Sequence, residues 1–205
     1  MSEWLLEWIP NIMGQLGYFG IALLMFLENL FPPIPSELIM PLAGFSVSRG
    51  DMAFAPVIVA GVVGTVLGAY PWYYIGKFLN EEKLEHFADK YGKWISVSAK
   101  DIHKANNWFN RHGGKAVFLC RLVPGVRTLI SLPAGINGMP LTPFTLYSTA
   151  GTTIWVLFLT GAGYKLGDHY DLVNKYLGPI SKIALISLAI FFIFWVLLKR
   201  LRQTS

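Results

Sequence analysis

Charged residues are scarce in this sequence, and long stretches have none. Only 14% of the 205 residues are charged, whereas 54% are hydrophobic. Residues 52–76, 128–164 and 183–198 contain no charge at all. Soluble domains rarely carry such runs, and stretches of about 20 apolar residues are typical of membrane-spanning helices. The composition therefore excludes an ordinary soluble domain and predicts one all-α, polytopic membrane domain over residues 1–205.

Cysteine and histidine are too few or too scattered for the sites they usually build. The lone Cys120 excludes an internal disulfide. The four histidines fall in polar segments without the spacing of metal ligands: His86, His103, His112 and His169. We therefore expect no metal and no other cofactor.

Basic residues are missing from the beginning of the chain. No Lys or Arg precedes Arg49, and the acidic Glu3 and Glu7 stand where a signal peptide has basic residues, so we expect no cleaved signal. The net charge of +5 comes from residues next to the apolar stretches. We interpret these positive charges as topology signals and contacts with lipid headgroups rather than as a nucleic-acid surface.

The first half begins with an interfacial helix, followed by two short apolar segments. Over residues 1–16, bulky apolar side chains share one helical face, and acidic ones recur on the other. Residues 17–48 are apolar, but Pro32, Pro33 and Pro35 interrupt them and leave two pieces too short to cross a bilayer. We therefore predict a re-entrant helical hairpin over 17–48, with its break at these prolines.

A full transmembrane helix is predicted over residues 54–76. Its glycines and alanines give a small-residue face, which fits either internal packing or a homodimer. Trp72, Tyr73 and Tyr74 near its end are typical of an aromatic belt at the membrane interface.

The middle of the chain, residues 77–115, is polar and basic, which predicts a cytoplasmic amphipathic linker at the membrane surface. Ser98 followed by Asp101 predicts the start of a helix in this linker. Gly113 and Gly114 predict its end.

The second half repeats the plan of the first. Residues 116–137 are a second apolar stretch interrupted at Pro124 and Gly125, which predicts a second re-entrant hairpin. Full transmembrane helices are predicted over 141–164 and 179–198.

Two observations predict that the halves are inverted copies of each other. Matching residues lie about 90 positions apart: Pro33 and Pro124, Ala43-Gly44 and Ala134-Gly135, Ala60-Gly61 and Ala150-Gly151, and Tyr74 and Tyr164. The basic linker 77–115 and the basic tail 199–202 both belong in the cytoplasm by the positive-inside rule, so an even number of crossings separates them. The second hairpin must then enter and leave on one side, and the first enters from the opposite side. We predict an inverted repeat with two opposed re-entrant hairpins, about three full transmembrane helices and interfacial amphipathic helices, with a cytoplasmic C-terminus.

Four charged residues lie beside the two predicted breaks. Glu28 and Glu37 flank the first, and Arg121 and Arg127 flank the second. Ionisable groups at membrane depth usually face a polar cavity and mark a transport pathway. Arginine suits a bidentate grip on phosphate, and burial disfavours the charged form of a carboxylate. We expect one phosphate headgroup between the arginines and a proton exchanged at Glu28 or Glu37, whose binding triggers release.

Simpler interpretations compete with this site. Arg121 lies six residues from Lys115 and could be an interfacial anchor whose long side chain reaches water. Glu37 could be an acidic residue favoured by the dipole at a helix start. A purely structural ion pairing would account for all four charges.

The motifs around these residues resemble one known family. They are Phe-Leu-Glu-Asn at 26–29, Pro-x-Pro-Ser-Glu at 33–37, Arg-Leu-Val-Pro-Gly-Val-Arg at 121–127 and Pro-Ala-Gly at 133–135. Together they are similar to the DedA family of membrane proteins, relatives of the eukaryotic VTT-domain scramblases, over roughly residues 17–165. Two departures stand out: Ser36-Glu37 replaces a common Gly-Asp, and Cys120-Arg121 replaces a common Gly-Arg.

The resemblance implies a function in the plasma membrane. Family members translocate lipids, with undecaprenyl phosphate and phosphatidylethanolamine as substrates, and depend on the proton motive force. The family's essential acidic residues fall on Glu28 and Glu37, and its essential arginines on Arg121 and Arg127. The expected partners are membrane lipids and protons.

Three functions follow from the sequence in order of preference. The first is a non-enzymatic transporter that flips a phosphate-bearing lipid. The second is a proton-coupled transporter of small ions or drugs, for which the same carboxylates would serve. The third is a membrane-embedded lipid phosphatase, which would need a nucleophile or a general base such as histidine beside the arginines.

Overall fold

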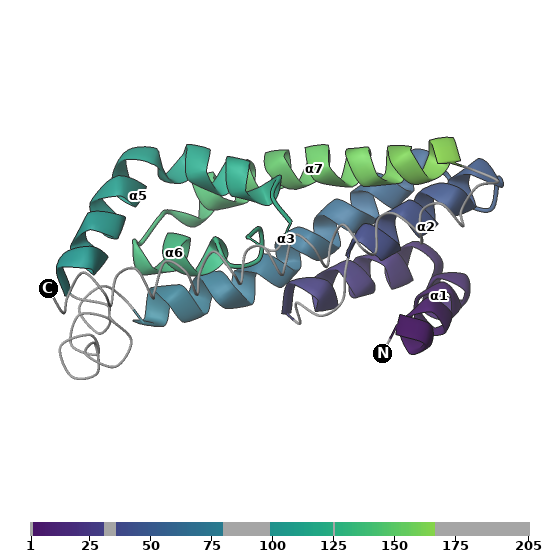
Figure 1. Cartoon of the computed structure of the whole chain (residues 1–205), viewed down its shortest axis with the longest axis horizontal. Helices are drawn as coiled ribbons and strands as arrows, with labels where there is room; N and C mark the ends of the chain where they lie inside the picture. The colour runs from purple at the N-terminus through teal and green to yellow at the C-terminus, as the bar shows by residue number, and fades with distance from the viewer. Residues whose placement is uncertain (1, 31–35, 80–98, 125, 167–205) are drawn as a thin grey trace, which may run out of the picture.

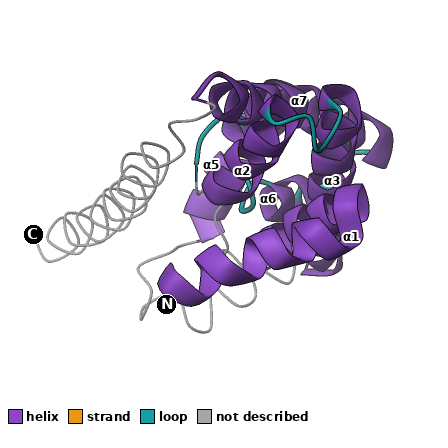
Figure 2. Cartoon of the chain, turned by 90° about the vertical axis from the view of Figure 1, so that its right-hand side faces the viewer, coloured by secondary structure: helices purple, strands orange, loops and turns teal. Residues whose placement is uncertain are grey.

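The computed structural model describes residues 2–30, 36–79, 99–124 and 126–166, and this part of the chain is helical without strands (Figure 1). Seen from one end, the helices pack side by side as a bundle (Figure 2). The helices of these residues are α1 Ser2–Leu30, α2 Ser36–Ser48, α3 Phe54–Leu79, α5 Ala99–Arg121, α6 Ser131–Ile136 and α7 Leu141–Leu166. The predicted all-α class is confirmed.

Two of these helices are long and apolar enough to cross a membrane, Trp8–Leu30 within α1 and Phe54–Leu79, which is α3. The predicted helix over 54–76 is therefore present and slightly longer. The helix α7 is as long as α3, with 26 residues, but its many threonines make it less apolar. Its role as a membrane span stays a prediction. The predicted span 179–198 and the tail 199–202 lie outside the described residues.

The first helix bends sharply at Gly17, where φ is 56° and ψ is −132°. Glycine adopts a positive φ without the steric penalty of a Cβ atom, which explains the residue at this point. The bend lies where the sequence predicts an interfacial helix to give way to the first hairpin. Because α1 continues across the bend, its apolar stretch is longer than residues 17–30 alone.

The helix α5 differs from the sequence prediction. It does not end at Gly113 and Gly114 but continues to Arg121. These glycines instead allow close ring packing, because a Cβ atom on Gly113 would lie 2.8 Å from the Phe109 ring. The predicted linker and second hairpin therefore share one helix. The predicted helix start at Ser98 lies outside the described residues.

The helices α1 and α5 both end in the middle part of the molecule, on opposite sides of it (Figure 1). From there α2 runs toward one end and α6 toward the other, while α3 and α7 pass along both. The helix α1 packs on α3, and α5 packs on α7. The short helices pack across this division, α2 on α7 and α6 on α3. Gly44 and Gly135 allow these crossings, because a Cβ atom on either would collide with backbone of the facing helix.

Two apolar clusters occupy the two ends of the bundle. One gathers residues of α1, α2, α3 and the second half of α7, such as Leu24, Ile39 and Val156. The other gathers residues of α3, α5, α6 and the start of α7, such as Tyr73 and Phe144. Polar side chains lie between the clusters, at the level of the breaks.

Two of the three residues predicted as an aromatic belt have a packing role instead. The Tyr73 side chain is 1% exposed, and its hydroxyl donates to the carbonyl of Met139 at 2.5 Å. Trp72 donates from Nε1 to the carbonyl of Asn29 at 2.8 Å. Only Tyr74, which is 52% exposed, keeps a surface position. The tertiary hydrogen bonds explain the difference, since they hold Tyr73 to the connection between α6 and α7 and Trp72 to the end of α1.

Candidate functional site

The four charged residues predicted to form a site all lie near the central breaks and are all buried. Glu28 lies near the end of α1, and Glu37 lies in the first turn of α2. Arg121 ends α5, and Arg127 lies in the turn that leads to α6. Their exposed fractions are 4%, 8%, 1% and 3% in chain order. Arg121 is therefore not an interfacial anchor reaching water.

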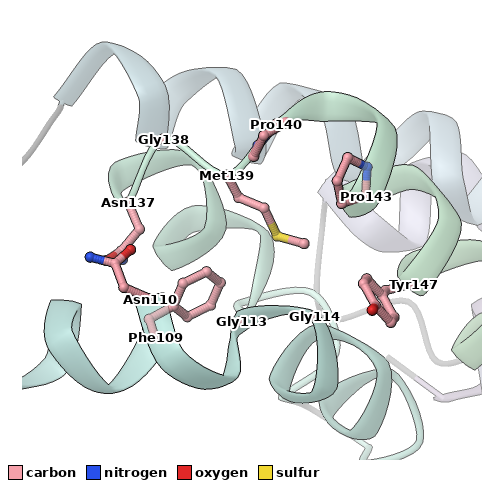
Figure 3. Close-up of a pocket in the computed structure, with 10 residues that line it drawn as sticks. All are labelled: Phe109, Asn110, Gly113, Gly114, Asn137, Gly138, Met139, Pro140, Pro143 and Tyr147. Atoms are coloured by element: carbon pink, nitrogen blue, oxygen red, sulfur yellow. The ribbon is translucent and has the colours of Figure 1, made fainter.

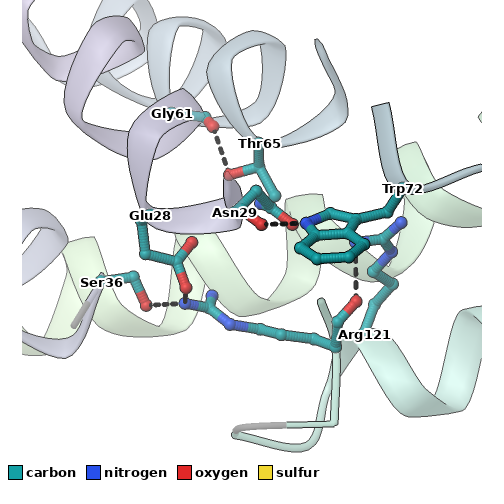
Figure 4. Close-up of polar contacts among 8 residues, drawn as sticks. Glu28, Asn29, Ser36, Gly61, Thr65, Trp72 and Arg121 are labelled. Carbon is teal, nitrogen blue, oxygen red and sulfur yellow. Dashed lines mark hydrogen bonds and ion pairs between the residues drawn. The ribbon is translucent and has the colours of Figure 1, made fainter. Parts of the chain in front are cut away.

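The Arg127 side chain connects the two halves of the chain. Its Nη2 forms an ion pair with Oε1 of Glu28 and also donates to the hydroxyl of Ser36. Figure 4 shows Glu28 and Ser36 pointing toward the same guanidinium. The guanidinium also lies over the Trp155 ring of α7, with Cζ 5.7 Å from the ring centre. One side chain thus contacts α1, α2 and α7.

Arg121 has different partners. Its Nη1 donates to the carbonyl of Arg127 at 2.8 Å, and its Nη2 donates to the hydroxyls of Ser131 at 3.0 Å and Ser148 at 3.1 Å. Its Cζ lies 5.8 Å from the centre of the Phe144 ring. Within the described residues no carboxylate forms an ion pair with it. Among the four buried charges, only Arg127 and Glu28 form a direct ion pair.

The side chain of Glu37 makes no ion pair or hydrogen bond with the other described residues. Its charge is close enough to repel that of Glu28. A position in the first turn of α2 also suits a carboxylate, because the helix dipole stabilises negative charge there. The dipole interpretation and the functional interpretation of Glu37 both fit this geometry.

Several buried polar atoms near the arginines have no hydrogen-bond partner among the residues that the structure describes. They are Oε2 of Glu28, both side-chain polar atoms of Asn29, Nε of Arg121, Nη1 of Arg127, Oγ1 of Thr152 and Nε1 of Trp155. Buried polar groups are usually paired, so a concentration of unpaired ones indicates a place built to receive water or a ligand.

Sequence reasoning did not find the neutral polar residues of this site. Ser36, Ser131 and Ser148 bind the guanidiniums, but isolated serines in apolar segments carry no distinctive pattern. A spacing signal was available on α7, where Ser148, Thr152 and Trp155 recur at helical intervals. The predicted break residues Pro32, Pro33, Pro35 and Gly125 lie outside the described residues, whereas Pro124 lies in the turn after α5.

A separate pocket of about 380 Å³ lies where α5 meets the start of α7 (Figure 3). Its lining includes Phe109, Met139 and Tyr147 but none of the four buried charges. In the described part of the chain, no group of His, Cys, Asp and Glu side chains could hold a metal ion.

Comparison with known proteins places this arrangement in a family. The VTT domain profile matches residues 20–165. The "Alkaline phosphatase-like protein" of Lactococcus lactis subsp. lactis is 39% identical over 94% of this chain and 90% of its own length. "Undecaprenyl phosphate transporter A" of Staphylococcus aureus is 35% identical over 92% of this chain and 93% of its own length. "Inner membrane protein YqjA" of Escherichia coli is 30% identical over 77% of this chain and 70% of its own length.

No solved structure matches the chain. The family assignment therefore rests on the profile and the relatives, which cover the helices that carry the buried charges. The chain is a membrane protein that belongs to the DedA family of VTT-domain proteins.

Proposed function

We propose that this protein is a transporter that moves a phosphate-bearing lipid, such as undecaprenyl phosphate, across the plasma membrane. The observation that carries the proposal is the buried Arg127, which contacts Glu28 and Ser36 on either side of the first break and whose Nη1 has no hydrogen-bond partner among the described residues. Two relatives named undecaprenyl phosphate transporter A, from Staphylococcus aureus and Bacillus subtilis, support the lipid class. A phospholipid such as phosphatidylethanolamine presents the same phosphate chemistry to the site.

The architecture that we propose is an inverted repeat with two opposed re-entrant hairpins. The helix contacts support it, because α1 on α3 mirrors α5 on α7, and α2 on α7 mirrors α6 on α3. Close glycine contacts repeat as well. Gly64 packs on α1 as Gly151 packs on α5, and Gly76 packs on α6 as Gly163 packs on α2. Opposed hairpins would place the four charges near the bilayer midplane with access from either side.

Charge balance suggests how a proton would assist transport. Two guanidiniums and two carboxylates sum to zero, so an anionic phosphate would leave the site negatively charged. Protonation of Glu28 would restore neutrality and leave the positive charge of Arg127 available to the phosphate. We therefore infer that protonation favours binding and that loss of the proton favours release. This order reverses the one expected from the sequence, because Glu28 is paired with the arginine that would grip the lipid.

The two arginines have different roles in this mechanism. Arg127 Nη1 has no partner in the described part of the chain, so Arg127 is assigned direct contact with the phosphate. Arg121 uses both Nη atoms on protein oxygens, so it contributes positive charge and holds the turn that carries Arg127. Glu37 would serve as a second proton-binding group that repels Glu28 when both are charged.

Reconstitution tests the proposal. Purified protein is placed in liposomes with headgroup-labelled undecaprenyl phosphate, and movement between leaflets is followed under an imposed pH gradient. Arg127→Ala should abolish transport, and Arg127→Lys should fail nearly as badly, because an ammonium lacks the planar fork of guanidinium. Arg49→Ala is the matched control, since Arg49 is 64% exposed and pairs with Asp51. Full activity of the lysine variant would contradict phosphate binding at Arg127.

One observation supports a second candidate, a lipid phosphatase. A relative is named alkaline phosphatase-like, and three serine hydroxyls lie on the buried arginines. Release of inorganic phosphate from a polyprenyl phosphate or diphosphate by purified protein would establish that activity. A small-ion or drug transporter is separated from both by flux of a small cation into liposomes that lack the labelled lipid.

A further inference from the structure

A polar stripe on α7 faces the two buried arginines. It consists of Ser148, Thr152 and Trp155, which fall within about 60° of one another around a helix. Ser148 accepts a hydrogen bond from Arg121, and the Trp155 ring lies under the guanidinium of Arg127. Thr152 is 2% exposed and lies between them in sequence on the same face. The stripe therefore passes from one arginine to the other.

The two remaining polar atoms of the stripe are unpaired. Thr152 Oγ1 and Trp155 Nε1 have no hydrogen-bond partner in the described part of the chain. Two other threonines of α7, Thr145 and Thr153, bond to the carbonyl four residues earlier, each at 2.8 Å. Thr152 does not form this hydrogen bond to the carbonyl four residues earlier. An unpaired buried donor is unfavourable, so Thr152 and Trp155 are expected to donate to something that enters the site.

The chemistry of the unpaired atoms indicates what enters. Indole N–H and guanidinium N–H groups only donate, and a threonine hydroxyl can donate. With Nη1 of Arg127 they give three donors on two neighbouring elements. A tetrahedral phosphate accepts hydrogen bonds from several directions, whereas a planar carboxylate accepts them close to one plane.

We propose that Thr152 and Trp155 are specificity-determining residues that donate to the phosphate oxygens of the lipid headgroup, beside Nη1 of Arg127. This inference rests on the proposed function and adds α7 to the site. It places the phosphate on the side of Arg127 away from Glu28. The lipid tail needs no contact with these residues.

Binding measurements test the inference. The probe is farnesyl phosphate added to purified protein in detergent, with farnesol as the uncharged control and farnesoic acid as the planar anion. Thr152→Val removes the hydroxyl at nearly constant volume, and Trp155→Phe removes the N–H but keeps a ring. Each should weaken farnesyl phosphate binding about 10-fold or more, as for a lost hydrogen bond to a charged group. Farnesoic acid should be affected less.

Matched variants separate recognition from packing. Thr160→Val is the control, because Thr160 is fully buried on α7, and its Oγ1 has no partner among the described residues, but it lies about two turns beyond Thr152. It should bind the probe like wild type, and Thr152→Ser should restore binding because it keeps the hydroxyl. Equal losses in Thr152→Val and Thr160→Val would overturn the inference.

Failure of the inference can be told from failure of the proposed function. Wild-type binding by Thr152→Val and Trp155→Phe, together with loss in Arg127→Ala, overturns only the role of α7. A wild-type protein that binds farnesyl phosphate no better than farnesol overturns the proposed function, and the role of α7 with it.

Discussion

Replacing Glu28 with glutamine should strengthen the binding of an anionic lipid and remove most of the dependence of binding on pH, leaving only the part that Glu37 contributes. In the wild-type protein the charge of Glu28 already compensates Arg127 through their ion pair. Glutamine keeps an oxygen that can accept from Arg127 but carries no charge. Glu28→Gln therefore imitates the protonated carboxyl, which the proposed mechanism assigns to the binding state.

The size of the effect follows from the geometry of the pair. A phosphate on the free side of the Arg127 guanidinium would lie about 6 Å from the Glu28 carboxylate. Two negative charges at that separation repel by about 3 kcal/mol at an effective dielectric constant of about 20. That repulsion corresponds to about 100-fold in affinity, and water entering the site would reduce it toward 10-fold. The variant should gain this factor at neutral and higher pH.

The assay needs a probe whose own charge does not change with pH. A phosphate monoester loses its second proton near pH 6, so a farnesyl methyl phosphate diester is the better ligand. Wild-type affinity should rise as the pH falls, whereas Glu28→Gln should bind tightly throughout. Asp51→Asn is the control, because Asp51 is an exposed acid far from the buried arginines in the sequence.

Transport should respond differently from binding. Glutamine at position 28 cannot become negatively charged, so the variant cannot restore the carboxylate charge that repels the phosphate. Glu28→Gln should therefore hold the lipid but not release it. Flux of labelled lipid in liposomes should therefore fall while equilibrium affinity rises. Weaker binding by Glu28→Gln, or a wild-type affinity that increases with pH, would refute the charge-balance mechanism.

Three further predictions concern stability, measured by thermal or denaturant unfolding in detergent. Gly44→Ala and Gly135→Ala should each destabilise the protein by about 2 kcal/mol or more through collision with a facing backbone. Gly161→Ala, inside α7 with open space around it, should be neutral or slightly stabilising. Unfolding of the Gly44 variant at the wild-type midpoint would contradict this packing. Arg121→Ala should lower stability by about 2–3 kcal/mol, because it leaves three buried acceptors without their donor; an unchanged midpoint would show that water replaces the guanidinium. Tyr73→Phe should lower the free energy of unfolding by about 1 kcal/mol through the lost hydrogen bond to Met139, and Tyr74→Phe should leave it unchanged. Equal effects of the two variants would contradict a stabilising role of that hydrogen bond.

Much of the helical plan could be predicted from the sequence because it depends on local properties. The helix predicted over 54–76 corresponds to α3, and the apolar piece between the proline break and residue 48 corresponds to α2. The four buried charges were found because charge is conspicuous in apolar sequence.

Other features depend on contacts between distant residues and were not predictable in this way. Gly113 and Gly114 are typical of a helix end, but ring packing against them lets α5 continue. Tyr73 has the composition of an interfacial residue and becomes buried through Met139, 66 positions away. The partners of Arg121 are a carbonyl and two serines, none of which differs in type from many others in the chain.

The exchange of short helices between the halves has a consequence for biogenesis. Since α2 needs α7 and α6 needs α3, neither half can complete its packing before the other is inserted. A fragment ending after α3 should expose the surfaces of α2 and α3 that normally pack on α7 and α6, and quality-control proteases should degrade it. Two fragments separated between α3 and α5, synthesised in the same cell, should rescue each other.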